Sequence, residues 1–94
     1  MRREDYLEKT VLLGANYADR NDEVVERRQY VGVIEDVDET EGIAIRLRNG
    51  ELLQLPPTFE ALQPAEPGEY TLQSTLEIIR DPDFLVVWTF REQT

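Results

Sequence analysis

The residues with the clearest potential for chemistry are the carboxylates of a candidate acidic loop, Asp36, Asp38, Glu39 and Glu41. The Asp-x-Asp start at Asp36 is similar to the start of a calcium-binding loop, in which oxygen ligands surround the cation. Such a loop requires Gly at its sixth position and Glu at its twelfth, where this chain has Glu41 and Leu47. Specific calcium binding, a weakly held cation and a solvated hairpin tip all stay open, and the pattern favours the hairpin tip.

Two pairs of carboxylates also have the spacing at which one side chain can act as an acid and the other as a base. They are Asp81 with Asp83, and Asp36 with Asp38. The chain contains no His and no Cys, which removes the usual base at neutral pH, the thiolate nucleophile and the commonest zinc ligands. We therefore expect no enzymatic activity, no cofactor and no metal site, and we interpret Asp81-Pro82-Asp83 as a turn.

Four arginines form a candidate interaction strip, namely Arg27, Arg28, Arg46 and Arg48. Arg46 and Arg48 alternate with the apolar residues of one expected strand, and Arg27 and Arg28 begin the part of the chain that should pair with it. A basic strip on an acidic chain could contact an anion, RNA or an acidic peptide. The alternative, which we favour, is that these arginines form cross-strand ion pairs with nearby Asp and Glu residues.

The elements that must position these side chains are strands. β-branched and aromatic residues predict a strand over residues 10–18 and a longer one over residues 23–37, with a turn at residues 19–22. The apolar residues of the longer strand change parity along its length. Gly32 is the expected point at which this bent strand turns its inner face outward, because a glycine there avoids a side-chain clash.

The middle of the chain has the clearest two-residue periodicity. Apolar residues alternate with Ala and Arg over residues 43–48, which predicts a strand. Asn49-Gly50 predicts a two-residue type I′ turn, after which residues 51–55 return antiparallel. Residues 58–62 are expected to form one short helical turn with Thr58 as its cap.

The last third of the chain is expected to hold two more strands. The first covers residues 70–78, with room for a break near Ser74, and the second places the aromatic residues of segment 84–90 on an inner face. Residues 1–9 and 91–94 are expected to be charged or polar tails, the first frayed or forming one short helix. Residues 1–94 are thus predicted to form a single, mostly β domain.

Composition limits the possible partners. The chain has 94 residues, 20 of them acidic and 10 basic, and a net charge of -10. This charge repels phosphate backbones and favours cationic partners, so it argues against nucleic acid. No apolar run approaches the roughly 20 residues that a membrane span needs. We expect a soluble, cytoplasmic protein with no membrane association.

Residues 28–50 resemble the Sm-like branch of the small SH3-like barrels. The resemblance rests on residues 28–34, in which Gly32 would bend a strand, and on Asp38 before the next hairpin. It implies a small antiparallel barrel, or a strongly bent sheet, of about five to seven strands. Gly42 stands where an Sm-like protein carries its RNA-contacting Asn, and the Arg-Gly pair of the second motif is missing. The likeness therefore supports the topology and weakens an RNA-binding role.

Three functions remain as hypotheses. The first is a non-catalytic interaction domain that uses a sheet edge and acidic loops to bind another protein or a second copy of itself. The second is an acidic inhibitor or immunity-type protein that neutralises a cationic partner. The third is a weak Sm-like RNA binder that uses the four arginines of the candidate interaction strip. The absence of any recognisable chemistry favours the first.

Overall fold

The computed structural model describes residues 2–73 and 75–91, and within them the chain is mostly β. The elements, in chain order, are η1 (Arg3–Asp5), β1 (Thr10–Ala18), β2 (Val24–Asp38), β3 (Gly42–Leu47), β4 (Leu52–Leu55), η2 (Phe59–Ala61), β5 (Gln63–Pro64), β6 (Glu69–Thr71), β7 (Ile78–Arg80) and β8 (Phe84–Arg91). The two η elements are single 3-10 turns. The predicted fold class, a mostly β domain with a strongly bent sheet, is confirmed.

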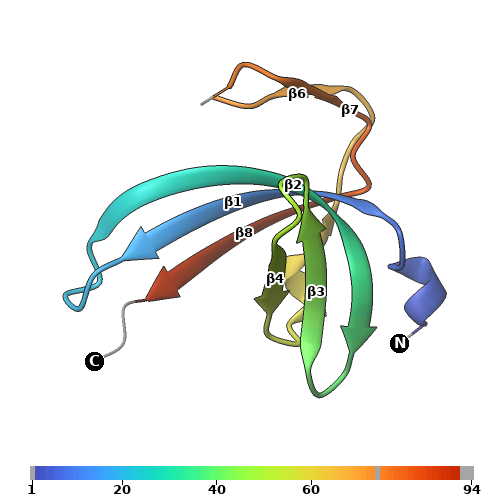
Figure 1. Ribbon diagram of the computed structural model, residues 1–94, viewed down its shortest axis with the longest axis horizontal. Helices are drawn as coiled ribbons and strands as arrows, with labels where there is room; N and C mark the ends of the chain where they lie inside the picture. The colour runs from blue at the N-terminus through green and yellow to red at the C-terminus, as the bar shows by residue number, and fades with distance from the viewer. Residues whose placement is uncertain (1, 74, 92–94) are drawn as a thin grey trace.

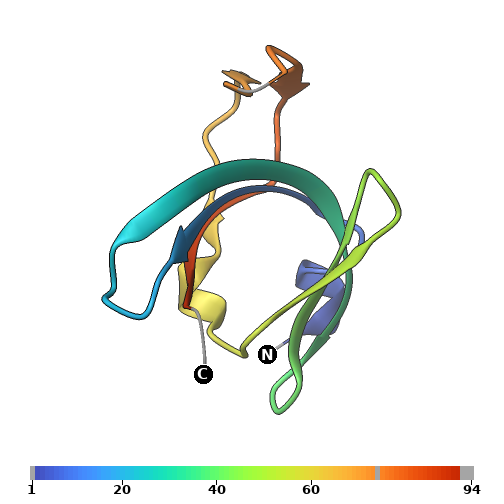
Figure 2. The ribbon, with the colours of Figure 1, turned by 60° about the vertical axis from the view of Figure 1, so that its left-hand side comes forward.

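Six of these strands form one curved sheet in the order β4-β3-β2-β1-β8-β5, and β6 pairs with β7 in a separate hairpin. The sheet curls round without closing, so it is a bent sheet and not a closed barrel (Figures 1 and 2). β8 runs parallel to β1, from Val11 opposite Phe84 to Ala18 opposite Arg91, so the expectation of a purely antiparallel sheet is wrong. The six strands of the bent sheet fall within the expected five to seven, and the β6–β7 hairpin adds two more outside it.

β2 joins two regions of the sheet. Its first part, from Val24, pairs with β1, whereas its last part, from Gly32, pairs with β3. We call the three-stranded region formed by residues 13–18, 24–31 and 86–91 the arm. The remainder of the large sheet, with η1 and η2, is called the bent half. In Figure 1 the arm extends to the left, away from β3 and β4.

The expected inversion at Gly32 is wrong. Tyr30 and Ile34, on either side of it, both pack on the main core, whereas Val31 packs on the opposite side of the sheet. The change of parity comes later, at an irregularity between Ile34 and Asp36, after which Val37 is buried. An extra residue in a β-bulge shifts side chains to the other face, which a glycine alone does not do.

The main core lies inside the curve of the sheet. The side chains of Leu13, Ile34, Ile43, Ile45 and Leu55 are the largest of those almost wholly buried there. Phe84, Val86, Trp88 and Phe90 lie on the same side, as the alternation in β8 predicts. Leu62, just after η2, fills the end of this core with an exposed fraction of 6%.

Several local predictions are corrected. Gly50 has φ of 92° but Asn49 does not have a positive φ, so the turn is not type I′. The Leu47 N–H donates to the Glu51 carbonyl and the Gly50 N–H to the Leu47 carbonyl, which encloses a three-residue loop ending on a left-handed glycine. Thr58 makes no side-chain cap for η2.

The predicted strand over residues 70–78 is wrong. Tyr70 pairs with Ile79 in the β6–β7 hairpin, so the chain reverses within the predicted segment. The break expected near Ser74 falls outside the described residues. The hairpin stands over the outer, convex face of the large sheet (Figures 1 and 2).

The ends of the chain are attached to the sheet where they are described. The Tyr6 ring lies 5.7 Å from that of Phe84, stacked on it, and 5.5 Å from that of Phe59. The Glu8 N–H donates to the Ile34 carbonyl. The expected N-terminal tail thus packs on the bent half from η1 onward. Arg91 ends β8, and residues 92–94 of the expected C-terminal tail lie outside the described residues.

Candidate functional site

The structure does not gather the four arginines of the candidate interaction strip on one face. Arg28 stands opposite Ala15 and Arg27 opposite Asn16, so these neighbours project to opposite faces of the sheet. Arg28 is on the concave side, where its guanidinium lies 2.9 Å from the Glu26 carboxylate. Arg27 is on the convex side, and its guanidinium forms no hydrogen bond or ion pair with any described residue.

Arg46 and Arg48 are both engaged by carboxylates on the outer face. Arg46 pairs with Glu35 across the β2–β3 ladder at 2.8 Å and also donates to the Gly50 carbonyl at 3.1 Å. Arg48 forms an ion pair with Glu77 of the β6–β7 hairpin and so links that hairpin to the sheet. Exposed pairs of this kind contribute little stability. Both guanidinium groups nevertheless have partners within the chain.

The candidate acidic loop lies at the tip of the β2–β3 hairpin. Asp36 is ion-paired with Arg3, and the Asp38 carboxylate accepts hydrogen bonds from the N–H groups of Glu41 and Thr40 at 2.8 and 2.7 Å. These two donors lower the pKa of Asp38 below its ordinary value. Glu39 follows in the same tip. Within residues 2–73 and 75–91, no three acidic side chains come together to form a site for a metal ion.

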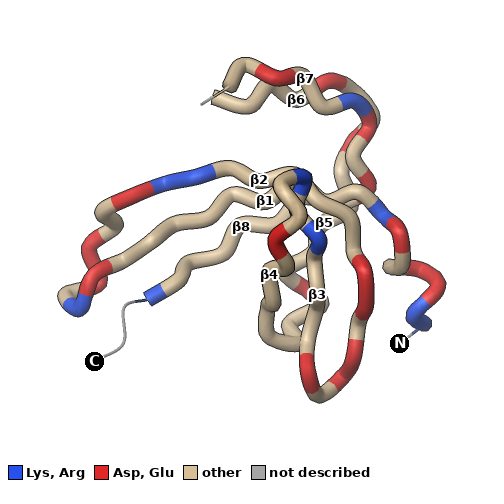
Figure 3. Tube along the Cα trace, viewed as in Figure 1, with Lys and Arg blue, Asp and Glu red and all other residues tan. Residues whose placement is uncertain are grey.

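The arm differs from the rest of the molecule in charge. Residues 10–18 and 84–90 contain no charged side chain, although the whole chain is 32% Asp, Glu, Lys and Arg. Figure 3 shows β1 and β8 of the arm without charge up to Arg91, with the charged residues concentrated at the turns and in β2. Depletion of charge with retention of Arg and aromatic residues is typical of the centre of a protein interface.

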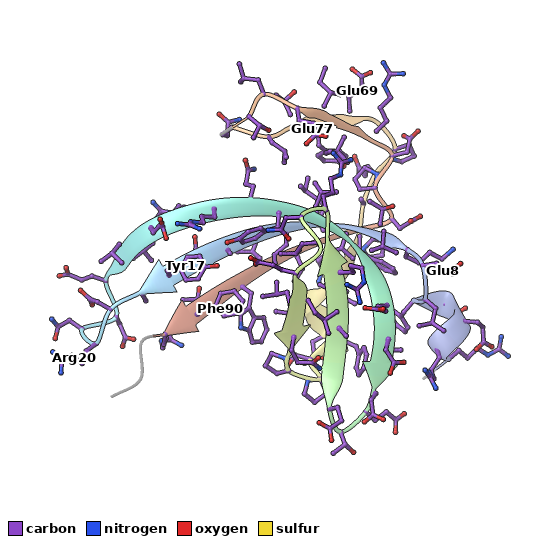
Figure 4. All side chains as sticks on the ribbon, in the orientation of Figure 1. Glu8, Tyr17, Arg20, Glu69, Glu77 and Phe90 are labelled. Atoms are coloured by element: carbon purple, nitrogen blue, oxygen red, sulfur yellow. The ribbon has the colours of Figure 1, made fainter. Side chains whose placement is uncertain are left out.

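The concave face of the arm is aromatic. The Tyr17 and Phe90 rings stack with centroids 5.4 Å apart, and the Tyr17 and Tyr30 hydroxyls share a hydrogen bond of 2.9 Å. Figure 4 shows Tyr17 and Phe90 on neighbouring parts of the arm, with Arg20 at its outer end. Burial disfavours the phenolate, and with the Tyr30 hydrogen bond it raises the pKa of Tyr17 to about 12.

The convex face of the arm carries an open hollow of about 660 Å³. Its lining includes Gly14, Asn16, Arg27, Gln29, Gln73 and Val87. Gly14 stands opposite Gln29 on one side and Val87 on the other, so the missing side chain leaves a gap in the middle of three strands. The Val87 side chain, 70% exposed, lies beside this gap.

Two residues of the candidate interaction strip, Arg27 and Arg28, are among the described residues that line the hollow. Gly14, Asn16, Gln73 and Val87 were missed. The uncharged character of residues 10–18 and 84–90 was a usable signal, because these segments stand out in so acidic a chain. Gln73 could not be found in this way, because its place depends on the β6–β7 hairpin folding back over the sheet.

Comparison with family models, with curated proteins and with solved structures found no match for this chain. In the part of the chain that the structure describes, no helix has the length and apolar character needed to span a membrane.

Proposed function

We propose that this chain is a non-catalytic interaction domain that binds another protein through the arm. The observation that carries the proposal is the coincidence of three properties in the arm: strands β1 and β8 without charge before Arg91, exposed aliphatic residues and open sheet edges. The bent half does not combine these properties, because its ion pairs and the acidic tip of the β2–β3 hairpin place charged groups on its surface.

The open edges supply hydrogen-bonding capacity. Among the described residues, β3 pairs with β2 only from Gly32 onward. On the side away from β1, Val24–Tyr30 therefore have no neighbouring strand and form an open edge. β5 pairs with β8 only at Phe84 and Leu85, so the segment from Val86 onward forms a second such edge. Unpaired N–H and C=O groups along an edge can accept an added strand from a partner.

The exposed side chains on the arm supply apolar area. Val24, Val25 and Val87 have exposed fractions of 40%, 68% and 70%. Burying such side chains against a partner gives about 25 cal/mol for each Å² of apolar surface removed from water. The arm therefore offers both backbone groups and apolar surface.

The proposal is tested with a charge placed on the open edge of β2. Val25→Lys puts a solvated ammonium group where an added strand would lie, and Leu52→Lys makes the same change on β4 in the bent half, at a residue 55% exposed. Partners are captured by cross-linking with the purified wild-type chain and identified by mass spectrometry. Sedimentation of the chain alone shows whether a second copy is the partner.

We expect the wild type and Leu52→Lys to retain one defined partner, and Val25→Lys to lose it. Circular dichroism should show that both variants keep the β spectrum of the wild type. A wild-type chain that stays monomeric and captures no defined protein would overturn the proposal. Equal capture by both variants would exclude this edge of the arm as the docking surface.

A further inference from the structure

We propose that the hollow on the convex face of the arm binds a carboxylate side chain from an extended, acidic segment of a partner protein. This inference rests on the proposed function and specifies the chemistry of the partner. It concerns the convex face, whereas strand addition concerns the edges of the arm, so the two can be tested separately.

The hollow is bounded on three sides by different elements. Gly14 of β1 forms its floor, Arg27 and Gln29 of β2 and Asn16 of β1 form its polar side, and Val87 of β8 forms its apolar side. Gln73, which follows β6, also lines it, and the β6–β7 hairpin stands over the convex face (Figure 1). A partner segment would therefore meet polar and apolar groups at the same time.

The β6–β7 hairpin is attached firmly enough to pre-form the hollow. Leu72 and Ile79 of the hairpin pack with Val31 and Leu12 of the sheet in a small second core, in which Leu72 and Ile79 are 5% and 3% exposed. The Gln73 N–H donates to Oε1 of Gln29 at 2.6 Å. A binding site that exists before its ligand arrives avoids the entropic cost of ordering it.

The charges around the hollow favour an anion. None of the described residues that line it is Asp or Glu, although the chain has 20 acidic residues. Arg28 is paired with Glu26 on the concave side, but the Arg27 guanidinium forms no hydrogen bond or ion pair within the described chain. A guanidinium group without a partner, next to an apolar surface, matches the bidentate geometry of a carboxylate.

The amide groups reinforce this preference. Because Oε1 of Gln29 accepts the Gln73 N–H, the Gln29 side-chain NH₂ group remains to donate. Asn16 stands opposite Arg27 across the β1–β2 ladder, so its amide can donate beside the guanidinium. Donors thus lie along one side of the hollow, while the floor at Gly14 and the side at Val87 are apolar. An extended segment that carries a carboxylate and an apolar side chain two positions apart presents both on one face, and so fits both parts.

The test uses two blocked pentapeptides and the full chain labelled with ¹⁵N. The acidic peptide has the sequence Val-Thr-Glu-Thr-Val, so that Glu and both Val side chains share one face of the extended chain, and its matched control replaces Glu with Gln. Amide shifts are followed during titration at low ionic strength. We expect the acidic peptide to shift the amides of Gly14, Asn16, Gln29 and Val87, and to bind about tenfold more tightly than the Gln peptide, because charge-assisted hydrogen bonds are stronger than neutral ones.

Two variants locate the interaction. Arg27→Gln should remove the roughly tenfold difference between the peptides, whereas Arg20→Gln, at the exposed β1–β2 turn, should leave it unchanged. Gly14→Val should weaken both peptides by raising an isopropyl group from the floor of the hollow. The fold has room for the Cβ atom of that side chain, since a Cβ at Gly14 would lie 3.7 Å from Val87 Cγ2, an ordinary van der Waals distance.

Three outcomes would overturn the inference. They are equal binding of the two peptides, shifts that map outside the hollow, and equal effects of Arg27→Gln and Arg20→Gln. The proposed function survives any of these results if Val25→Lys still abolishes capture of the defined partner. It fails independently if the wild-type chain captures no partner at all.

Discussion

The bent half and the arm are built on the same long strand, but they pack in opposite ways. In the bent half, β2 and β3 approach so closely that a Cβ placed on Gly32 would lie 2.6 Å from the Arg46 carbonyl oxygen. In the arm, a Cβ on Gly14 would meet nothing nearer than 3.7 Å. One glycine permits close packing, and the other leaves space on a surface. The bent half is thus closely packed at its glycine, whereas the arm keeps open space on its surface, as the proposed docking role requires.

Side-chain burial shows the same difference. Ile34, Ile43 and Ile45 of the bent half have exposed fractions of 1% or less. On the arm, the rings of Tyr17, Trp88 and Phe90 are only half-buried, and Val87 is largely in solvent. Large apolar side chains left partly exposed in a small domain mark a surface on which a partner can bury them.

The largest expected effect comes from making the same substitution at the two strand glycines. Gly32→Ala should lower the free energy of unfolding by about 3 kcal/mol or more, because its Cβ would clash with backbone that cannot move aside. Gly14→Ala should leave the free energy unchanged or raise it by about 0.5 kcal/mol, through the reduced entropy of the unfolded chain. Urea denaturation of both variants measures this difference. Similar losses in both would show that the arm is packed as closely as the bent half.

Truncation of a buried side chain comes next in size. Ile45→Ala removes a side chain that is fully buried in the main core, and we expect a loss of about 3 kcal/mol or slightly less in the free energy of unfolding. Val87→Ala on the arm should change it by less than about 0.5 kcal/mol. Thermal and urea unfolding compare the two variants. A large loss with Val87→Ala would mean that Val87 stabilises the fold and is not available to a partner.

A smaller effect is expected for the hydrogen bond on the concave face of the arm. Tyr17→Phe removes the bond to the Tyr30 hydroxyl and should cost about 1 kcal/mol of unfolding free energy. Tyr6→Phe in the bent half provides the control, because its ring contacts with Phe59 and Phe84 are kept. Equal losses in both variants would show that the hydrogen bond has no specific role.

The same pair of tyrosines predicts a dependence on alkaline pH. The pKa of Tyr17 rises from 10.0 to about 12 on folding, so its neutral form stabilises the folded state. That contribution is fully present below pH 10 and is lost as the pH rises from 10 towards about 12. Absorbance titration of tyrosinate in the wild type and in Tyr17→Phe measures the shift. Titration of every tyrosine near pH 10 would contradict it.

The smallest expected effect lies at the hairpin tip of the bent half. Because the N–H groups of Glu41 and Thr40 lower the pKa of Asp38 in the folded state, its ionised form stabilises the hairpin above pH 3.8. This contribution is lost as the pH falls below that value. Asp38→Asn should therefore be slightly less stable than the wild type at pH 7, with the difference vanishing in acid. A difference that persists at low pH would show that charge is not its cause.

Much of the fold could be predicted because local sequence patterns determine it. β-branched and aromatic residues gave the bounds of β1 as residues 10–18. Alternation placed Trp88 and Phe90 on the core side, since side chains of a strand project alternately to its two faces. The polar residues 19–22 gave the first turn, where Asp19 accepts the N–H groups of Asn21 and Glu23. Such features depend on neighbours within a few residues.

The candidate site could be predicted only in part. The sequence singled out Arg27 but grouped it with three arginines that the structure engages in ion pairs. Which of them has a free guanidinium depends on acids brought close by folding, such as Glu77, which lies 29 positions from Arg48 along the chain. The position of the bulge after Ile34, which sets the faces of β2, was likewise hidden in an apolar pattern that also suited a bend at Gly32.

The amino-acid sequence by itself determined a mostly β, acidic domain, because residue types and their alternation act over short distances. Tertiary structure alone decided that β8 would lie parallel to β1, that the sheet would stay open, and that Gln73 would line the hollow with Gly14. The physical reason is that strand partners and hollows result from contacts between distant segments. These contacts depend on packing and on hydrogen bonding across the sheet, which local periodicity does not encode.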